Sequence, residues 1–154
     1  MASTSATDNG SSDPASIRLA AMNLLARREH SLGELRRKLG RRFTDASAVE
    51  EQLQRLADEG LQCDRRFAES FVRQRIQRGH GPLRIRQELR QRALDAAVVD
   101  AALGDANVDW EALAGHVLER KFGLLPAEDL HDKARRARFL QYRGFSPEHY
   151  RVLI

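Results

Sequence analysis

An internal repeat of about 50 residues is the feature that most constrains the fold of this chain. Leu35 aligns with Ile85 and Leu39 with Leu89 at an offset of 50, and Leu89 aligns with Leu140 at an offset of 51. Within each copy the apolar positions are spaced three or four residues apart, as on one face of a helix. One helix cannot bury such a stripe by itself, so three helices are expected to close around each core.

The third copy requires two offsets, 46 over its first helix and 51 over the rest. The change implies a five-residue insertion near residues 123–129, where a loop between two helices can absorb it. Arg136 stands where the second copy has Ile85, so the helix that contains it is expected to pack differently. Every aligned apolar position is expected to be buried. The aligned sets include Ile17, Phe67 and Leu113; Met22, Val72 and Leu118; Val49, Val99 and Tyr150; Leu53, Leu103 and Ile154.

Capping residues and helix breakers divide the chain into nine expected helices. Ser31 and Glu34 have the spacing of a capping box, Pro82 and Pro147 suit first helical positions, and Gly60 suits a helix end. The expected helices are about 14–29, 31–42, 46–59, 65–78, 82–92, 96–104, 108–122, 126–143 and 147–154, with Asp13, Asp64, Asp95 and Ser146 among the N-caps. Only 6% of residues are aromatic and 31% are charged, which also favours helices. We therefore predict an all-α fold of three tandem three-helix repeats in an elongated, curved array.

The domain boundaries follow from this alignment. Residues 1–13 are Ser, Thr, Ala, Asp, Asn and Gly after the initial Met, and they lack the basic start and apolar middle of a signal peptide. We interpret them as a disordered tail. The three repeats are expected at residues 14–63, 64–106 and 107–154.

Charge is distributed in blocks of opposite sign. Net charge is −1 over residues 1–64, +7 over 65–92, −7 over 93–132 and +5 over 133–154. A basic block beside an acidic block suggests a partner with surfaces of both signs. The alternative is that both blocks are ordinary solvated helix faces.

The chain lacks the motifs of common enzymes. It contains no phosphate-binding GxxxxGK[ST] loop, no GxGxxG and no HExxH, and its five histidines do not pair at helical spacing. The single Cys63 excludes an internal disulfide and fits a reducing cytoplasm. No apolar run approaches the roughly 20 residues of a membrane-spanning helix. We therefore expect a cytoplasmic, non-enzymatic protein with no cofactor, metal site or small-molecule substrate.

Four segments resemble the RecX family, in the family's order. Residues 28–39 (REHSLGELRRKL) resemble the family's R-x-x-S-x-x-E-L-R-x-K-L opening, and 64–72 (DRRFAESFV) resemble its D-x-x-F/Y-A-x-x-F-V stretch. Residues 81–89 (GPLRIRQEL) are similar to its G-x-x-R-I-x-x-E-L stretch, and 143–146 match its R-G-F-S. The chain departs from the family before Asp64, where Cys63 replaces one of two acidic residues, and after Gly123.

The resemblance implies a regulator that binds the RecA filament on single-stranded DNA. Members of the family inhibit the ATPase, strand-exchange and coprotease activities of RecA and favour filament disassembly. They thereby modulate recombination, repair and the SOS response. An elongated body with alternating charge could follow a filament groove and contact several subunits, some through bound DNA. The candidate contact residues are Arg73, Arg78, Arg84, Arg86, Arg90, Arg92, Arg135, Arg136, Arg138 and Arg143.

Two other functions are compatible with the residues. A helix-turn-helix-like module that binds DNA directly is one, because Arg86 and Arg90 share a helix face, although few side chains suited to reading bases accompany them. A helical adaptor for an unrelated protein is the other. We expect Arg84, Arg86, Arg90 and Arg92 to be mostly exposed.

Arg75 is expected to differ from the other basic residues. On a helical wheel it falls within the apolar arc that Phe67 and Ile76 span. Its guanidinium must pair with an acid, for which Glu88 and Asp100 are candidates, or donate to helix-end carbonyls. The alternative is that its stem covers the core edge while its head stays in water.

Overall fold

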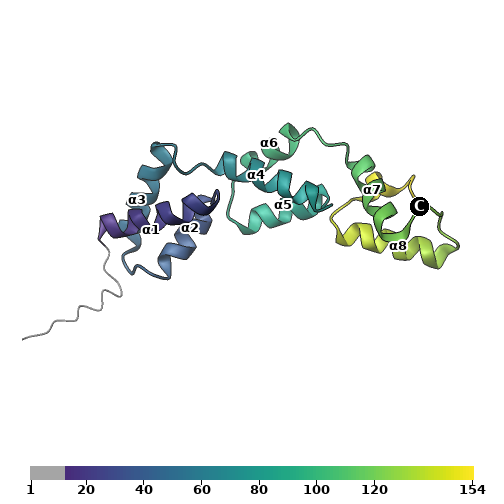
Figure 1. Cartoon of the computed structure of the whole chain (residues 1–154), viewed down its shortest axis with the longest axis horizontal. Coiled ribbons are helices and arrows are strands. Elements are labelled where there is room, and N and C mark those ends of the chain that lie inside the picture. Colours follow the sequence, from purple (N-terminus) through teal and green to yellow (C-terminus); the bar gives the residue numbers. More distant parts are fainter. Residues whose placement is uncertain (1–12) are drawn as a thin grey trace, which may run out of the picture. The chain divides into compact units, whose positions relative to one another are not determined.

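The structure, a computed structural model, describes residues 13–154, and over that range it consists of nine helices without a strand. The helices are α1 (Pro14–Arg27), α2 (Leu32–Gly40), α3 (Ala46–Asp58), α4 (Asp64–Gln77), α5 (Pro82–Gln91), α6 (Ala96–Asp105), α7 (Trp110–Phe122), α8 (Leu130–Tyr142) and α9 (Pro147–Tyr150) (Figure 1). The all-α class and the number of helices are confirmed. The tail expected at residues 1–13 lies outside the described range, apart from Asp13.

Helix packing divides the chain into two compact units. Of the described residues, the first holds 13–67 together with Arg92–Leu94, and the second holds 68–91 and 95–154. In the first unit α1 packs on α3, and α2 packs on both. In the second, α5 packs on α6, while α7 packs on α8 and α9 (Figure 1).

The aligned apolar positions supply the cores. Leu39, Leu89 and Leu140 are at most 2% exposed, as the repeat predicts. The core of the first three helices consists of Ile17, Ala20, Ala21, Leu35, Leu39, Phe43, Val49, Leu53 and Leu56. That of the last three consists of Ala114, Val117, Leu118, Leu140, Phe145 and Tyr150. The expectation was wrong at Met22, which is 40% exposed on α1. The other exceptions are only partly buried: Ile76 and Phe122, which align at the offset of 46, and Leu113 and Ile154.

Side-chain caps fix several helix starts. The Asp13 carboxylate accepts a hydrogen bond from the Ser16 amide at 3.3 Å, as predicted. The capping box is confirmed: the Glu34 amide donates to Ser31 Oγ at 3.0 Å, and the Ser31 amide donates to Glu34 Oε1 at 3.2 Å. Each bond satisfies an amide that lacks a partner inside the helix.

Three predicted starts were wrong in detail. Asp64 is the first residue of α4, and its carboxylate accepts from the amide of Leu32 at 2.8 Å instead of capping its own helix. Helix α7 starts later than expected because Asp109 caps it. Helix α8 likewise starts only after Asp129, whose carboxylate accepts from the Asp132 amide at 2.8 Å. Asp95 occupies the predicted cap position without making a side-chain cap bond.

The insertion before α8 explains how an arginine can replace a core residue. Arg136 is 7% exposed at the position aligned with Ile85. Its Nη1 donates to the carbonyl of Leu125 at 3.0 Å, within the inserted segment, and its Nη2 lies 3.3 Å from Asp132. The loop that changes the offset therefore also supplies a partner for the buried charge.

Candidate functional site

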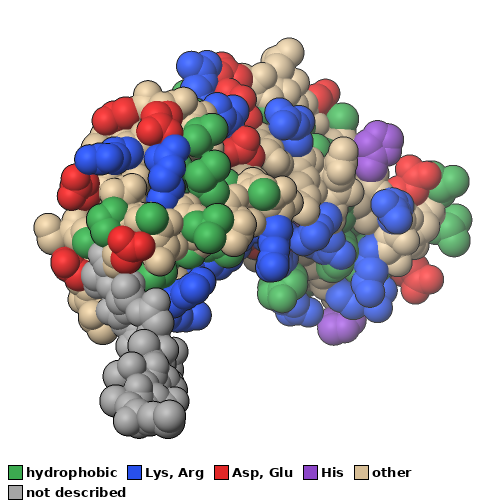
Figure 2. Space-filling model, turned by 60° about the vertical axis from the view of Figure 1, so that its left-hand side comes forward, with side chains coloured by type: hydrophobic (Ala, Val, Ile, Leu, Met, Phe, Trp, Pro, Cys, Tyr) green, Lys and Arg blue, Asp and Glu red, His purple; other side chains and the backbone are tan. Residues whose placement is uncertain are grey.

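The second unit carries most of the candidate contact residues. Among the ten predicted arginines, the exposed ones are Arg73, Arg78, Arg90, Arg135 and Arg138. Arg135 pairs with Asp132 at 2.9 Å, whereas the other four take part in no ion pair within residues 13–154. Figure 2 shows Lys and Arg side chains gathered in the lower part of the visible face, where Asp and Glu side chains are few.

Four of the ten are less available than predicted. Arg84 and Arg86 are about one-third exposed, and each forms an ion pair: Arg84 with Glu88 at 3.2 Å, and Arg86 with Asp100. Arg92 is only partly exposed as well. Arg136 is buried, and its guanidinium donates to the Leu125 carbonyl in the loop before α8, so little of this side chain is accessible to a partner. Glu88 lies one turn after Arg84 on α5, a spacing that the sequence shows, whereas Asp100 lies on α6, where a count of charges along the chain does not reveal the pair.

Arg75 has the structural role that the helical wheel indicated. Its Nε lies 2.8 Å from Glu88 Oε2, and the two side chains are 14% and 19% exposed. The guanidinium also lies over the ring of Phe71, at 4.5 Å from the centroid. Glu88 thus receives both Arg75 and Arg84, and it links α4 to α5. Asp100, the other candidate partner, pairs with Arg86 instead.

A close backbone contact connects the start of α5 with the turn between α8 and α9. The Gly81 amide donates to the Arg143 carbonyl at 2.7 Å, and the Leu83 amide donates to the Gly144 carbonyl at 3.0 Å. Gly144 has a φ of +99°, and a Cβ on it would overlap the backbone of Arg84. Glycine is required where backbones approach so closely. This contact places Arg143 beside the end of α4.

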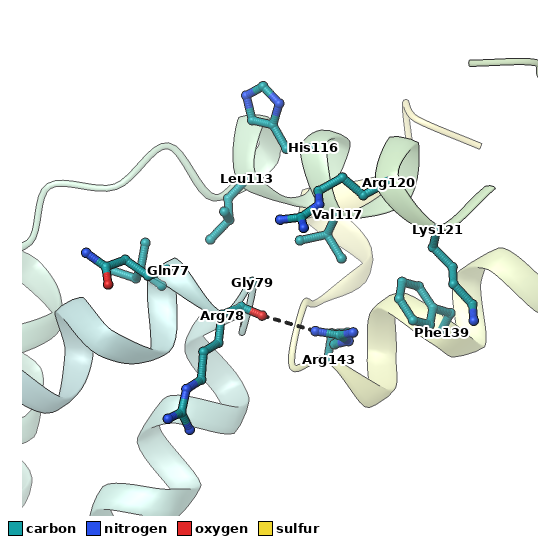
Figure 3. A pocket seen from close by; sticks show the side chains of 11 residues that line it. Gln77, Arg78, Gly79, Leu113, His116, Val117, Arg120, Lys121, Phe139 and Arg143 are labelled. Carbon is teal, nitrogen blue, oxygen red and sulfur yellow. Dashed lines mark hydrogen bonds between the residues drawn. The ribbon is translucent and has the colours of Figure 1, made fainter. Parts of the chain in front are cut away.

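The pocket drawn in Figure 3 lies beside that contact. It has a volume of about 280 Å³ and is formed by the end of α4, one face of α7 and the last turns of α8. Its lining residues are Ile76, Gln77, Arg78, Gly79, Leu113, His116, Val117, Arg120, Lys121, Phe139 and Arg143. Five of these eleven are Lys, Arg or His, and none is acidic.

The cations of the pocket come from different helices. Arg143 Nη1 donates to the Arg78 carbonyl at 3.1 Å, and the Arg143 guanidinium lies 5.1 Å from the centroid of Phe139. Lys121 Nζ lies 5.8 Å from the same centroid. Figure 3 shows Arg120 and Arg143 on either side of Val117, whereas the Arg78 side chain points away from them.

Arg120 and Lys121 were missed from the sequence. Both lie in the segment whose net charge is −7, so a sum over that segment hides them. Their position was nevertheless readable, because they stand between the aligned apolar residues Leu118 and Phe122 at the end of α7. Helical spacing directs Arg120 away from that core face, whereas Lys121 follows Val117 by four residues and is exposed because it lies at the end of the helix.

The surrounding positive charge also acts on a buried histidine. His80 is 8% exposed at the turn after α4. Burial lowers the pKa of its imidazole, and the charges of Arg84, Arg75 and Arg143 add to this effect, although Glu88 opposes it. His80 therefore remains neutral near pH 7.

Metal-binding and membrane-spanning features do not occur in the described part of the chain. Between residues 13 and 154 no three His, Cys, Asp or Glu side chains gather as a metal site. No helix in the same range has both the length and the apolar character needed to cross a bilayer.

Comparison with known proteins gives the same family for three successive segments of the chain. Residues 18–56, 64–103 and 109–151 match the family models of the first, second and third three-helix domains of RecX. The chain is 51% identical over 136 residues to Regulatory protein RecX of Halorhodospira halophila, covering 88% of this chain and 84% of that protein. It is 47% identical over 135 residues to Regulatory protein RecX of Pseudomonas entomophila, covering 88% and 87%.

Solved structures share the fold. A crystal structure of regulatory protein RecX superposes with a TM-score of 0.75 at 26% identity, covering 90% of this chain and 70% of the other. RecX from Lactobacillus salivarius superposes with a TM-score of 0.72 at 23% identity, covering 91% and 93%, and supports the fold alone. With three domain matches in order and relatives near 50% identity, this chain belongs to the RecX family of regulatory proteins.

Proposed function

We propose that this chain is a non-catalytic regulator of the recombinase RecA. It binds the RecA filament on single-stranded DNA, inhibits the ATPase, strand-exchange and coprotease activities of RecA, and favours filament disassembly. In this role it modulates recombination, DNA repair and the SOS response. It acts in the cytoplasm, where RecA filaments assemble on DNA.

Family membership carries this proposal. The three RecX domains follow one another from residue 18 to residue 151, and close relatives are named regulatory proteins. The unpaired cations of the second unit add physical support, because Arg73, Arg78, Arg90 and Arg138 are exposed and form no ion pair within residues 13–154. Exposed charges without internal partners are available to a partner molecule.

An ATPase assay separates the proposal from direct DNA binding. RecA is first saturated on single-stranded DNA, and the purified chain is then added while ATP hydrolysis is followed. A filament regulator inhibits hydrolysis under these conditions, and additional free DNA relieves the inhibition at most in part, because the chain contacts RecA as well as DNA. Relief in proportion to free DNA would identify a simple competitor for DNA, and no inhibition at all would contradict the proposal.

Charge reversal tests the contact surface. Arg73→Glu with Arg90→Glu should weaken inhibition at least fivefold without lowering the melting temperature, because both side chains are exposed and unpaired within residues 13–154. Arg86 is unsuitable for this test, since its loss would also break the pair with Asp100.

The matched control for this pair is in the first unit. Arg37→Glu with Arg41→Glu makes the same change in net charge on two exposed residues of that unit. Equal effects of the two double variants would show that only net charge matters.

A further inference from the structure

We infer that the pocket between α4, α7 and α8 binds a phosphodiester group of single-stranded DNA. The inference deepens the proposed function, on which it rests for the presence of DNA in the partner. It assigns the contact to particular side chains, chiefly Arg120 and Arg143, with Lys121 beside them. Two of these three were absent from the contact residues that the sequence indicated.

Arg143 is positioned before any ligand arrives. One of its Nη atoms is bound to the Arg78 carbonyl, and its guanidinium packs against the ring of Phe139. The backbone bonds of Gly81 and Leu83 hold the turn that carries it. A guanidinium held in this way retains free N–H donors, and binding an anion costs it little further side-chain entropy.

The positive charges that line the pocket are not neutralised by acidic residues of the pocket itself. Arg120, Lys121 and Arg143 line the pocket together with no acidic residue, and no ion pair involves any of them in the described part of the chain. Lys121 Nζ and the Arg143 guanidinium lie 5.8 and 5.1 Å from the centroid of the same ring, that of Phe139, so two like charges have this ring as a common neighbour. A bound anion would relieve this repulsion and would gain charge-assisted hydrogen bonds.

The shape of the pocket favours a phosphodiester over a bare ion. The pocket is about 280 Å³ in volume, and Ile76, Leu113 and Val117 supply aliphatic surface beside the cations. Figure 3 shows Leu113 and Val117 on the side of α7 that faces the end of α4. Such surface can contact the carbon atoms of a sugar while the guanidinium groups contact the phosphate oxygens.

Neighbouring cations favour a polyanion over a single acidic side chain. Arg78 lies at the pocket rim with its side chain directed away, and Arg138 is exposed on α8. Neither forms an ion pair within residues 13–154. A nucleic acid strand presents a phosphate at every nucleotide, so it can use several such cations together, with a strong dependence on salt.

Fluorescence anisotropy with a labelled oligodeoxythymidylate tests this site on the full chain. Arg120→Gln should weaken binding at least fivefold at low salt, and adding Arg143→Gln should weaken it further. The slope of log affinity against log salt should fall by about 0.7 for each phosphate that the variant no longer neutralises. The control is Arg37→Gln with Arg41→Gln, which removes two exposed charges from the first unit and should change affinity less than twofold.

Two results would overturn the inference. One is unchanged DNA affinity in the folded Arg120→Gln variant, which alters an exposed residue. The other is a larger effect of that variant on binding of a labelled oligoglutamate than on binding of the oligonucleotide, which would assign the pocket to an acidic peptide. Failure here is distinct from failure of the proposed function, because inhibition of RecA ATPase by the unmodified chain is measured separately.

Discussion

At the residue scale, Arg75 shows how a basic residue can belong to the core and not to the partner surface. Its place in the apolar arc of α4 was readable from the sequence, and Glu88 is the partner found in the structure. Arg73 lies two residues away on the same helix, and it is exposed. Two arginines in one basic block therefore have different roles because they point in different directions.

Replacing Arg75 should destabilise the protein. Arg75→Ala removes an ion pair between side chains that are mostly buried, and we expect a loss of about 1–3 kcal/mol in the free energy of unfolding. Arg84 still pairs with Glu88, which limits the loss. Urea unfolding followed by circular dichroism measures the effect, and Arg73→Ala is the matched control, for which we expect no significant change. Identical urea unfolding curves for the two variants would show that the Arg75–Glu88 ion pair contributes nothing to stability.

Buried histidines should make stability depend on pH. His30 is 2% exposed, its Nδ1 lies 3.1 Å from the Arg28 carbonyl, and Lys38 Nζ lies 3.0 Å from its Nε2. Burial lowers the pKa of His30 from 6.5, and the charges of Arg28 and Lys38 act in the same direction, whereas the hydrogen bond with the Arg28 carbonyl and the charge of Glu34 oppose them. Between the folded and the unfolded pKa the unfolded chain binds more protons, so stability falls as pH drops below about 6.5.

Thermal melts between pH 8 and 5.5 test this dependence. The melting temperature should fall toward pH 5.5, and it should fall less in a His30→Gln, His80→Gln variant, because the pKa of His80 is also lowered, chiefly by burial. His131→Gln, at an exposed position in the first turn of α8, is the control and should keep the wild-type dependence. A double variant with the full wild-type dependence would assign it to other groups.

At the element scale, the contact between the start of α5 and the turn after α8 should be intolerant of a side chain. Gly144→Ala forces a positive φ on an alanine and places a Cβ against the Arg84 backbone. We expect a loss of at least about 1–3 kcal/mol from the backbone conformation, with a further loss from the overlap. Differential scanning calorimetry should show a lower melting temperature.

Gly104→Ala is a control for which the expected change in stability has the opposite sign. Gly104 lies within α6, and a Cβ there meets no atom within 4 Å. Alanine should therefore stabilise the helix by about 0.5–1 kcal/mol. If both glycine variants shifted the melting temperature in the same direction, the α5 contact would not be the cause.

Helix starts were predictable where the signal is local. The capping box of Ser31 and Glu34 was readable because both partners lie within one turn. Asp64 was misassigned because its carboxylate binds the Leu32 amide, 32 residues away in sequence. The start of α8 was misplaced because the extra segment is used as a loop, whose Leu125 carbonyl holds Arg136. Both errors concern tertiary contacts that no short window contains.

For the whole molecule, the repeat predicted the cores better than charge counting predicted the site. The spacing of apolar residues predicts burial well, because the apolar face of a helix is the face that packs against other helices. The net charge of a segment does not show which charged side chains form ion pairs or which of them lie close together in the fold. Arg86 is neutralised by Asp100 on the next helix, while Arg120 and Lys121 lie in an acidic segment yet line a basic pocket. Only the three-dimensional arrangement separates these cases.

The repeat makes a final prediction about equivalent positions. Leu39, Leu89 and Leu140 belong to one aligned set and are 2%, 0% and 0% exposed. Replacing any of them by alanine removes buried methyl groups and leaves a cavity, so each variant should lose about 2–5 kcal/mol of unfolding free energy. Equilibrium urea unfolding measures this loss. Hydrogen exchange should show the largest loss of protection in the three-helix repeat to which the replaced leucine belongs.

A matched comparison uses Leu19, which is 62% exposed on α1. Leu19→Ala changes the same side chain at a position outside the aligned set, and it should alter stability by less than about 0.5 kcal/mol. A loss that small at any of the three aligned leucines would mean that the repeat alignment is wrong there. Similar large losses at all three would show that the three cores are energetically alike, although Arg136 occupies the place of an apolar residue in the third. In that case the Leu125 carbonyl and Asp132 compensate for the buried guanidinium.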